Sequence, residues 1–239
     1  MKKLFILIAF LIPFTVWAND PVGPMRKSNF SLDIEITSKY IWRGLEYGNA
    51  PVAFGTLGYN YKGLNVFALG GYALNGSHSE VDLGMSYSYK GLTIGVSDYF
   101  FPTAVGEKDG YSDFKKNETG HSMECYLTLA PSKLHLWMTL STYFYGADKK
   151  INGSQAYSSY VELGYNHSFN DDNALSAWIG ANLNKSFYTD YNSGLNMVNV
   201  AVKYYTDIPF GKYKLPVSGT FMYNPYKNKP YFSLSFYLN

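Results

Sequence analysis

The stretch GYNYKGLNV, residues 58–66, returns 28 residues later as SYSYKGLTI, residues 86–94. Each copy predicts the end of one strand, a Lys-Gly turn and the start of the next strand. A glycine in the second turn position supplies the positive φ that a tight hairpin requires. A repeat of this length holds two strands of about ten residues, one short turn and one longer loop. The spacing therefore predicts a series of antiparallel hairpins.

Extended over the chain, the same pattern predicts twelve strands. The connections alternate between compact turns, such as KG, PS, NDDN and PFGKYK, and longer polar loops, such as residues 103–120. Short turns at one rim and long loops at the other are typical of a bacterial outer-membrane barrel with both termini on the periplasmic side. The expected strands are residues 29–45, 52–61, 64–74, 80–89, 92–101, 121–130, 133–145, 157–169, 174–185, 195–206, 215–224 and 230–238.

Apolar and polar residues alternate within these segments. In the last one, Phe232, Leu234, Phe236 and Leu238 share one face, and serines occupy the other. A soluble β-sandwich would alternate as well, but it would bury its apolar face in a compact core. Alternation, loop asymmetry and an aromatic terminal strand together predict an all-β fold, an antiparallel up-and-down transmembrane β-barrel of about 12 strands.

The composition favours a membrane interface. The chain has 24 Tyr, 16 Phe and 4 Trp, residues that are enriched where one end of a side chain is apolar and the other is wet. Beyond residue 18 no run of 18 apolar residues predicts a transmembrane helix. The single Cys125 cannot form an internal disulfide.

The first 18 residues have the pattern of a secretory signal. Lys2 and Lys3 precede an apolar run that Pro13 interrupts, and Ala18 provides a small residue for cleavage. We expect residues 1–18 to be removed and residues 19–239 to form one barrel domain in the bacterial outer membrane. Its expected partners are outer-membrane lipid, lipopolysaccharide and the barrel-assembly machinery, in an oligomeric state that the sequence leaves open. Without Lys2 and Lys3, 20 − 2 = 18 basic residues balance 18 acidic ones, and no basic excess indicates nucleic acid.

The stretch SKYIWRGLEYG, residues 38–48, places an arginine between a tryptophan and a glycine. An unpaired guanidinium in an apolar medium is expensive, so the direction of Arg43 matters. If one strand runs over residues 29–45, alternation sends Arg43 into the lumen and Trp42 outward. The same alternation predicts a charged lumen made of Arg43, Glu80, Asp82, Glu124, Glu162, Lys39, Lys203, Asp33 and Glu35. It predicts membrane-interface aromatics at Tyr40, Trp42, Tyr87, Tyr89 and Tyr204.

This charged set holds six acidic and three basic residues, a net charge of −3. It predicts either an ion-pair network that fills the barrel or a selectivity constriction, since charged rings set preference in pores. Twelve strands about 4.8 Å apart at a tilt of about 40° give a diameter of roughly 24 Å, which side chains narrow to roughly 10 Å or less. The sequence therefore predicts a small porin-like channel for small polar or cationic solutes. The alternative is a non-conducting structural or surface-interaction barrel, such as an adhesin, with a plugged lumen.

Two features test this interpretation. Asp98 shares a face with Ile94 and Val96, so either a bulge shifts the register there or Asp98 lies above the bilayer. A serine hydrolase would need His121 beside Ser159, but one strand between them implies about 9–10 Å where roughly 3 Å is needed. The other histidines have no metal-ligand spacing. We therefore expect no enzymatic activity, no metal and no cofactor.

Three segments carry a family resemblance. SKYIWRG, SEVDLGMSYSY (residues 79–89) and VSDYFFP (residues 96–102) resemble the Gcw_chp or TorF-like family of bacterial outer-membrane β-barrel proteins. Those proteins open with Ser-x-Tyr-x-x-Arg-Gly, followed by a Glu-x-Asp strand and a Tyr-rich strand that ends at Pro. The match covers roughly the first half of the mature chain. The resemblance implies location and fold rather than activity, and departure from the family is expected in loop 103–120.

Overall fold

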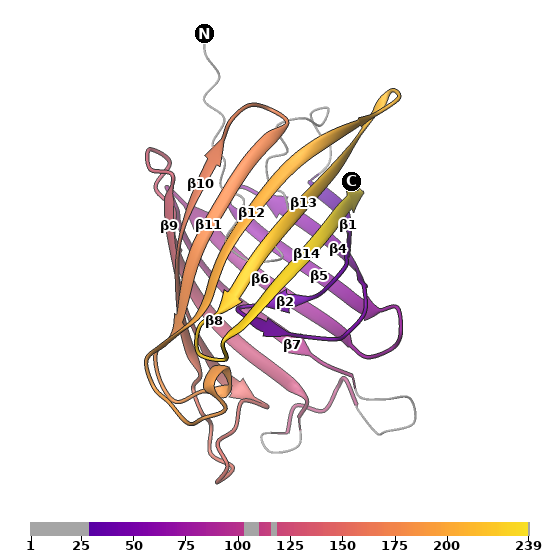
Figure 1. Cartoon of the computed structure of the whole chain (residues 1–239). Coiled ribbons are helices and arrows are strands. Elements are labelled where there is room, and N and C mark those ends of the chain that lie inside the picture. The colour runs from indigo at the N-terminus through magenta and orange to yellow at the C-terminus, as the bar shows by residue number, and fades with distance from the viewer. Residues whose placement is uncertain (1–28, 103–109, 116–118, 239) are drawn as a thin grey trace.

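The computed structural model describes residues 29–102, 110–115 and 119–238. Twelve antiparallel strands close into a barrel in which β1 pairs with β14, so the predicted fold is confirmed (Figure 1). No helix in these three ranges is long and apolar enough to span a membrane. The wall strands are β1 (Phe30–Thr37), β4 (Val52–Tyr61), β5 (Leu64–Ala73), β6 (Ser79–Tyr89), β7 (Leu92–Phe100), β8 (His121–Leu129), β9 (Leu136–Gly146), β10 (Ser159–Ser168), β11 (Asn173–Asn182), β12 (Asn196–Phe210), β13 (Tyr213–Asn224) and β14 (Lys229–Leu238).

The expected signal peptide, residues 1–18, lies outside the described residues and stays a prediction. The domain assignment of residues 19–239 likewise stays a prediction. β1 begins, and β14 ends, at the end of the barrel where the tight turns lie (Figure 1).

The repeated Lys-Gly turns form as expected. Lys62 and Gly63 have φ of 47° and 89°, and Lys90 and Gly91 have φ of 49° and 85°. Two successive residues with positive φ are typical of the type I′ turn, whose twist matches that of the flanking strands. The connection PFGKYK is shorter than predicted. Phe210 pairs with Tyr213, so the strands continue to a two-residue turn.

Side chains alternate between the outer surface and the lumen along the wall. On β14, Phe232 and Phe236 are exposed on the outer surface, and Ser233 and Ser235 are buried inside. The register at Asp98 is unbroken, because Asp98 pairs with Leu83 on β6 and with Met123 on β8. The bulge predicted as one explanation for Asp98 is therefore wrong, and Asp98 belongs to the outward row.

Inward-facing glycines make room for aromatic rings from neighbouring strands. A Cβ atom on Gly180 would lie 1.8 Å from the Tyr160 hydroxyl, and one on Gly164 would lie 2.2 Å from Trp137 Cε2. A ring that covers a strand glycine in this way packs the interior without widening the barrel. These rings therefore occupy part of the space inside the barrel.

Replacing Gly180 with valine should lower the free energy of unfolding by about 1–3 kcal/mol, because the added methyl groups overpack the contact with Tyr160. Thermal unfolding in detergent, followed by circular dichroism, measures the change. Gly55→Val is the matched control, since a Cβ on Gly55 meets no atom within 4 Å. Equal stability of the two variants would contradict the prediction.

Candidate functional site

A short hairpin crosses the lumen. After Thr37 the chain leaves the wall, and β2 (Ile41–Trp42) pairs with β3 (Leu45–Glu46) as a separate two-stranded sheet. We call residues 41–46 the inner hairpin. Its turn is made by Arg43 and Gly44, with φ of 48° and 77°. A Cβ on Gly44 would lie 2.0 Å from the carbonyl oxygen of Val198, and Asn224 Nδ2 donates to the Gly44 carbonyl at 3.0 Å. The tip therefore presses against β12 and β13.

Two interface predictions are wrong because of this hairpin. Tyr40 and Trp42 were expected at the membrane interface, but they are 7% and 5% exposed inside the barrel. The predicted strand 29–45 ends at Thr37, so wall alternation does not apply to the residues that follow. Both side chains join the aromatic core cluster, defined as Tyr40, Trp42, Val52, Phe54, Phe67, Leu69, Ala73, Tyr99, Tyr143, Tyr160, Tyr188 and Val198.

Arg43 contacts three members of this cluster, Trp42, Tyr160 and Tyr188. Its Nη1 and Nη2 donate to the two oxygens of Glu124 at 2.5 and 3.1 Å, and Nη1 also donates to the Tyr188 hydroxyl at 2.7 Å. The guanidinium carbon lies 4.3 Å from the ring centre of Trp42 and 4.7 Å from that of Tyr160. A bidentate carboxylate and two aromatic faces are the partners that a desolvated guanidinium requires. Arg43 and Glu124 thus join the hairpin tip to β8.

Sequence reasoning did not identify Tyr188 or Tyr160 as site residues. Tyr188 belongs to η1 (Phe187–Thr189), in the connection between β11 and β12. It is 145 residues from Arg43 in the chain. No local pattern signals such a contact, although the high tyrosine content indicates that aromatic groups were available.

Two further acids lie side by side on β6. Glu80 and Asp82 are 2% and 1% exposed and face the lumen. Glu80 Oε2 accepts from the Tyr40 hydroxyl at 3.4 Å and lies 3.2 Å from His78 Nε2. Glu80 Oε1 and Asp82 Oδ1 have no hydrogen-bond partner among the described residues. This side of the lumen therefore holds more acid than base.

The remaining predicted lumen residues lie on other strands. On β10, Glu162 accepts from the Tyr160 hydroxyl at 2.5 Å and from Asn199 Nδ2 at 3.2 Å. On β12, Lys203 Nζ donates to the Tyr237 hydroxyl at 2.8 Å. Asp33 and Glu35 on β1 are half-buried. The remaining predicted lumen residues therefore lie on β1, β10 and β12, each with its own surroundings.

Lys39 departs from its expected place on the wall. It belongs to the segment that leaves β1, and its Nζ lies 2.5 Å from Glu46 Oε1. Lys229 Nζ lies 2.7 Å from the other oxygen of Glu46. Hydrogen bonds from Lys229 and Lys39 lower the pKa of Glu46, so the carboxylate stays charged. The three side chains join the base of the inner hairpin to the start of β14.

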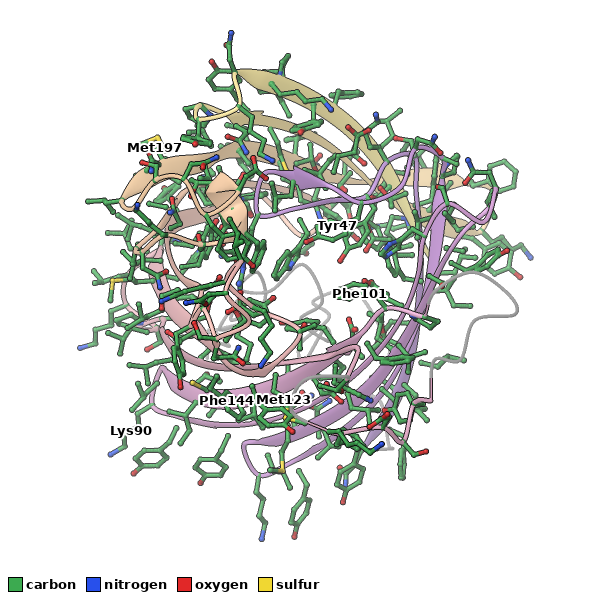
Figure 2. All side chains as sticks on the ribbon, turned by 90° about the horizontal axis from the view of Figure 1, so that it is seen from below. Tyr47, Lys90, Phe101, Met123, Phe144 and Met197 are labelled. Atoms are coloured by element: carbon green, nitrogen blue, oxygen red, sulfur yellow. The ribbon has the colours of Figure 1, made fainter. Side chains whose placement is uncertain are left out.

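The view along the barrel axis shows which side chains lie inside the barrel and which lie at its periphery. Tyr47 and Phe101 lie toward the middle of the barrel, whereas Lys90 and Met197 lie at its periphery (Figure 2). The Tyr47 and Phe101 rings stack with their centres 6.0 Å apart and an interplanar angle of 16°. The predicted interface residues Tyr87, Tyr89 and Tyr204 are exposed. They belong to the outward rows of β6 and β12.

On the outer wall, His121 is fully buried against Asp98. Its Nδ1 lies 2.7 Å from Asp98 Oδ2, and its Nε2 lies 2.6 Å from the Tyr111 carbonyl oxygen. The Phe114 ring stacks on the imidazole at 4.2 Å. The outward carboxylate is thus covered by residues 110–115. Ser159 bonds to Thr142 and the Tyr157 carbonyl instead, so the structure does not bring His121 and Ser159 together.

His121→Ala should release residues 110–115 from the wall, because it removes two hydrogen bonds and a stacked ring. Loss of a hydrogen bond to a charged group costs about 1.5–3 kcal/mol, which should speed trypsin cleavage after Lys115 roughly tenfold or more. Limited digestion followed by mass spectrometry measures the rate. His135→Ala is the control because His135 is exposed. An unchanged rate for His121→Ala would contradict the contact.

No group of three or more His, Cys, Asp or Glu side chains suited to a metal occurs within residues 29–102, 110–115 and 119–238. The expectation of no metal and no cofactor stays a prediction.

Comparison with solved structures identifies the architecture. The KdgM porin in complex with disordered oligogalacturonate is similar at a TM-score of 0.51 and 11% identity, over 87% of this chain and 98% of that one. The two chains share the closed antiparallel β-barrel fold. An outer membrane channel from Pseudomonas putida F1 is similar at a TM-score of 0.48 and 11% identity, over 90% and 95% of the two chains. No family model matches the sequence, and no curated protein matches it either. The resemblance to the Gcw_chp or TorF-like family is therefore not confirmed.

Proposed function

We propose that this porin-like barrel is a channel for small polar or cationic solutes, with its constriction at the inner hairpin. The observation that carries the proposal is the acid excess of the interior. Arg43 is bonded to Glu124, and Glu80 and Asp82 remain on the neighbouring wall with carboxylate oxygens that lack partners among the described residues. Carboxyl groups that line a narrow passage favour cations over anions.

The same charge distribution argues against an anionic solute. The KdgM structure holds oligogalacturonate, whose carboxylates are negative at neutral pH. Six acidic and three basic residues of the expected lumen set would repel such a chain. The shared fold therefore supports a channel here without supporting the same ligand.

A second candidate is a non-conducting structural or surface-interaction barrel. It is favoured by the aromatic core cluster, which fills the lumen around the inner hairpin. In either case the outward aromatic rows would contact outer-membrane lipid and lipopolysaccharide, and β14 would be the strand presented to the barrel-assembly machinery.

Planar-bilayer recording of the refolded protein tests the proposal. A channel with a net negative interior should give discrete current steps and a reversal potential of cation-selective sign under a potassium chloride gradient. The preference should weaken as salt rises, because the Debye length falls from about 30 Å at 0.01 M to about 3 Å at 1 M. Folded protein that inserts without current would favour the non-conducting barrel. Anion selectivity would contradict the assignment of solute charge.

A further inference from the structure

The wall is incomplete at its long-loop end. β14 pairs with β13 up to Lys229, but its pairing with β1 covers Ser235 to Leu238 alone. β4 begins at Val52, opposite Thr37. Ser38 bonds to Leu234 through its N–H, which donates to the Leu234 carbonyl, and through its hydroxyl, which accepts from the Leu234 N–H. Among the described residues, no strand pairs with residues 229–233 on the β1 side. Free backbone N–H and C=O groups at a sheet edge invite another strand, and they are not tolerated in contact with lipid hydrocarbon.

The segment that fits this edge is residues 38–51 of the same chain. If the register of β1 and β4 continued beyond Thr37 and Val52, Arg43 would face Glu46 across the new pair of strands. Gly44 and Leu45 would be left as a two-residue turn with glycine in its first position, the arrangement of a type II′ hairpin. Opposite charges directly across a pair of strands stabilise it.

The register with β14 continues as far as Phe232. Beyond Thr37 and Ser235 it would place Tyr40 opposite Phe232 and Trp42 opposite Pro230, all on the outer face. Pro230 lacks an N–H, so the extended ladder has one hydrogen bond fewer at its end. The first contact of this extension already exists, because the Ser38 N–H donates to the Leu234 carbonyl at 2.8 Å.

Neither the proline nor the alternation of this segment opposes such an extension. The Pro51 carbonyl accepts from Leu74 at 2.8 Å, so the side of Pro51 that lacks an N–H faces β5 rather than β1. Alternation would send Lys39 and Arg43 inward and would send Tyr40 and Trp42 to the membrane interface, where aromatic side chains are favoured.

We propose that residues 38–51 have two placements: the inner hairpin across the lumen, and a wall hairpin that extends β1 and β4 along the free edge of β14. Arg43 keeps a carboxylate partner in both, Glu124 in the first and Glu46 in the second. The consequence for permeation rests on the proposed channel function. The hairpin narrows the lumen in the first placement and leaves it wider in the second, so the exchange is a gate built from two packings of one segment.

Cysteine pairs distinguish the two placements. Cys125 is exposed and is first replaced by serine. Tyr40→Cys is then combined with Phe232→Cys. In the structure Tyr40 is buried inside and Phe232 is 59% exposed outside, so the wall separates them. In the wall hairpin their Cα atoms would be about 5.5 Å apart, within the disulfide range of about 4.4–6.8 Å.

Two further variants make the result interpretable. Ile36→Cys with Phe236→Cys is the matched control, because the structure already pairs these outward residues on β1 and β14. Tyr47→Cys with Phe101→Cys, joined by a short bifunctional thiol reagent, holds the inner hairpin in the lumen, where the two rings stack. Each variant is refolded, oxidised or cross-linked, and recorded in a planar bilayer.

We expect the disulfide between positions 40 and 232 to form and to hold the conductance high until it is reduced. Arg43→Ala should increase the yield of this disulfide about tenfold or more, because the buried bidentate pair with Glu124 that it removes contributes more than a single cross-strand pair with Glu46. The cross-link between positions 47 and 101 should keep the conductance low, even with Arg43→Ala.

The inference is overturned if the control pair forms its disulfide but no disulfide forms between positions 40 and 232. This result must hold both with Arg43 present and in the Arg43→Ala variant. A rise in conductance on Arg43→Ala alone would then leave the proposed channel function standing. If the disulfide forms and no current flows, the two placements are supported and the channel function is the part that fails.

Discussion

Replacing Arg43 with alanine should raise both the conductance and the cation preference of the channel. Glu124 would lose both guanidinium hydrogen bonds while it stays buried. Removal of one partner of a buried ion pair costs about 3–5 kcal/mol, so the inner hairpin loses most of its attachment to β8. The predicted lumen set also loses one of its three positive charges against six negative ones. Single-channel recording and reversal potentials under a salt gradient measure the two effects.

Arg43→Lys is the matched control for charge. A lysine keeps the positive charge but cannot reproduce the two parallel hydrogen bonds to Glu124. Its selectivity should stay near that of the wild type while its conductance rises part of the way. If the barrel is the non-conducting alternative, Arg43→Ala should lower thermal stability and open no path. A conducting alanine variant with an unchanged reversal potential would show that Arg43 does not face the permeation path.

Replacing Phe236 with aspartate should prevent most of the protein from assembling. Phe236 is 44% exposed on the outer surface and lies opposite Ile36 at the seam between the first and last strands. Only four residue pairs join β1 and β14 at that seam, so loss of one contact weakens a large part of it. A carboxylate on a lipid-facing row costs on the order of 2 kcal/mol, depending on depth. The unassembled chain should be degraded, and the heat-modifiable folded band in outer-membrane fractions measures the loss.

Phe236→Leu separates the effect of charge from that of ring size. It keeps the row apolar and should assemble at close to the wild-type level. Wild-type amounts of folded Phe236→Asp protein would mean that this row does not face lipid.

Local features determined most of the barrel. The alternation of apolar and polar residues and the Lys-Gly turns depend on neighbours in sequence or on the next strand. For this reason the sequence alone predicted twelve wall strands and placed Glu80, Asp82 and Glu124 inside. The same alternation indicated that Asp98 faces outward. Only the tertiary structure shows that His121 is its partner and that residues 110–115 cover it.

The path of residues 38–51 was decided by tertiary structure. Residues 38–45 alternate as a wall strand would, so local pattern predicts the wall. The structure places them across the lumen, because Arg43 hydrogen-bonds to Glu124 and Tyr188, which lie 81 and 145 residues away in the chain. No short-range signal encodes which carboxylate a guanidinium will meet inside a closed barrel. The sequence by itself determined that Arg43 needs a partner in the interior, and closure of the barrel determined which one, since it brings β8 and η1 to the hairpin tip.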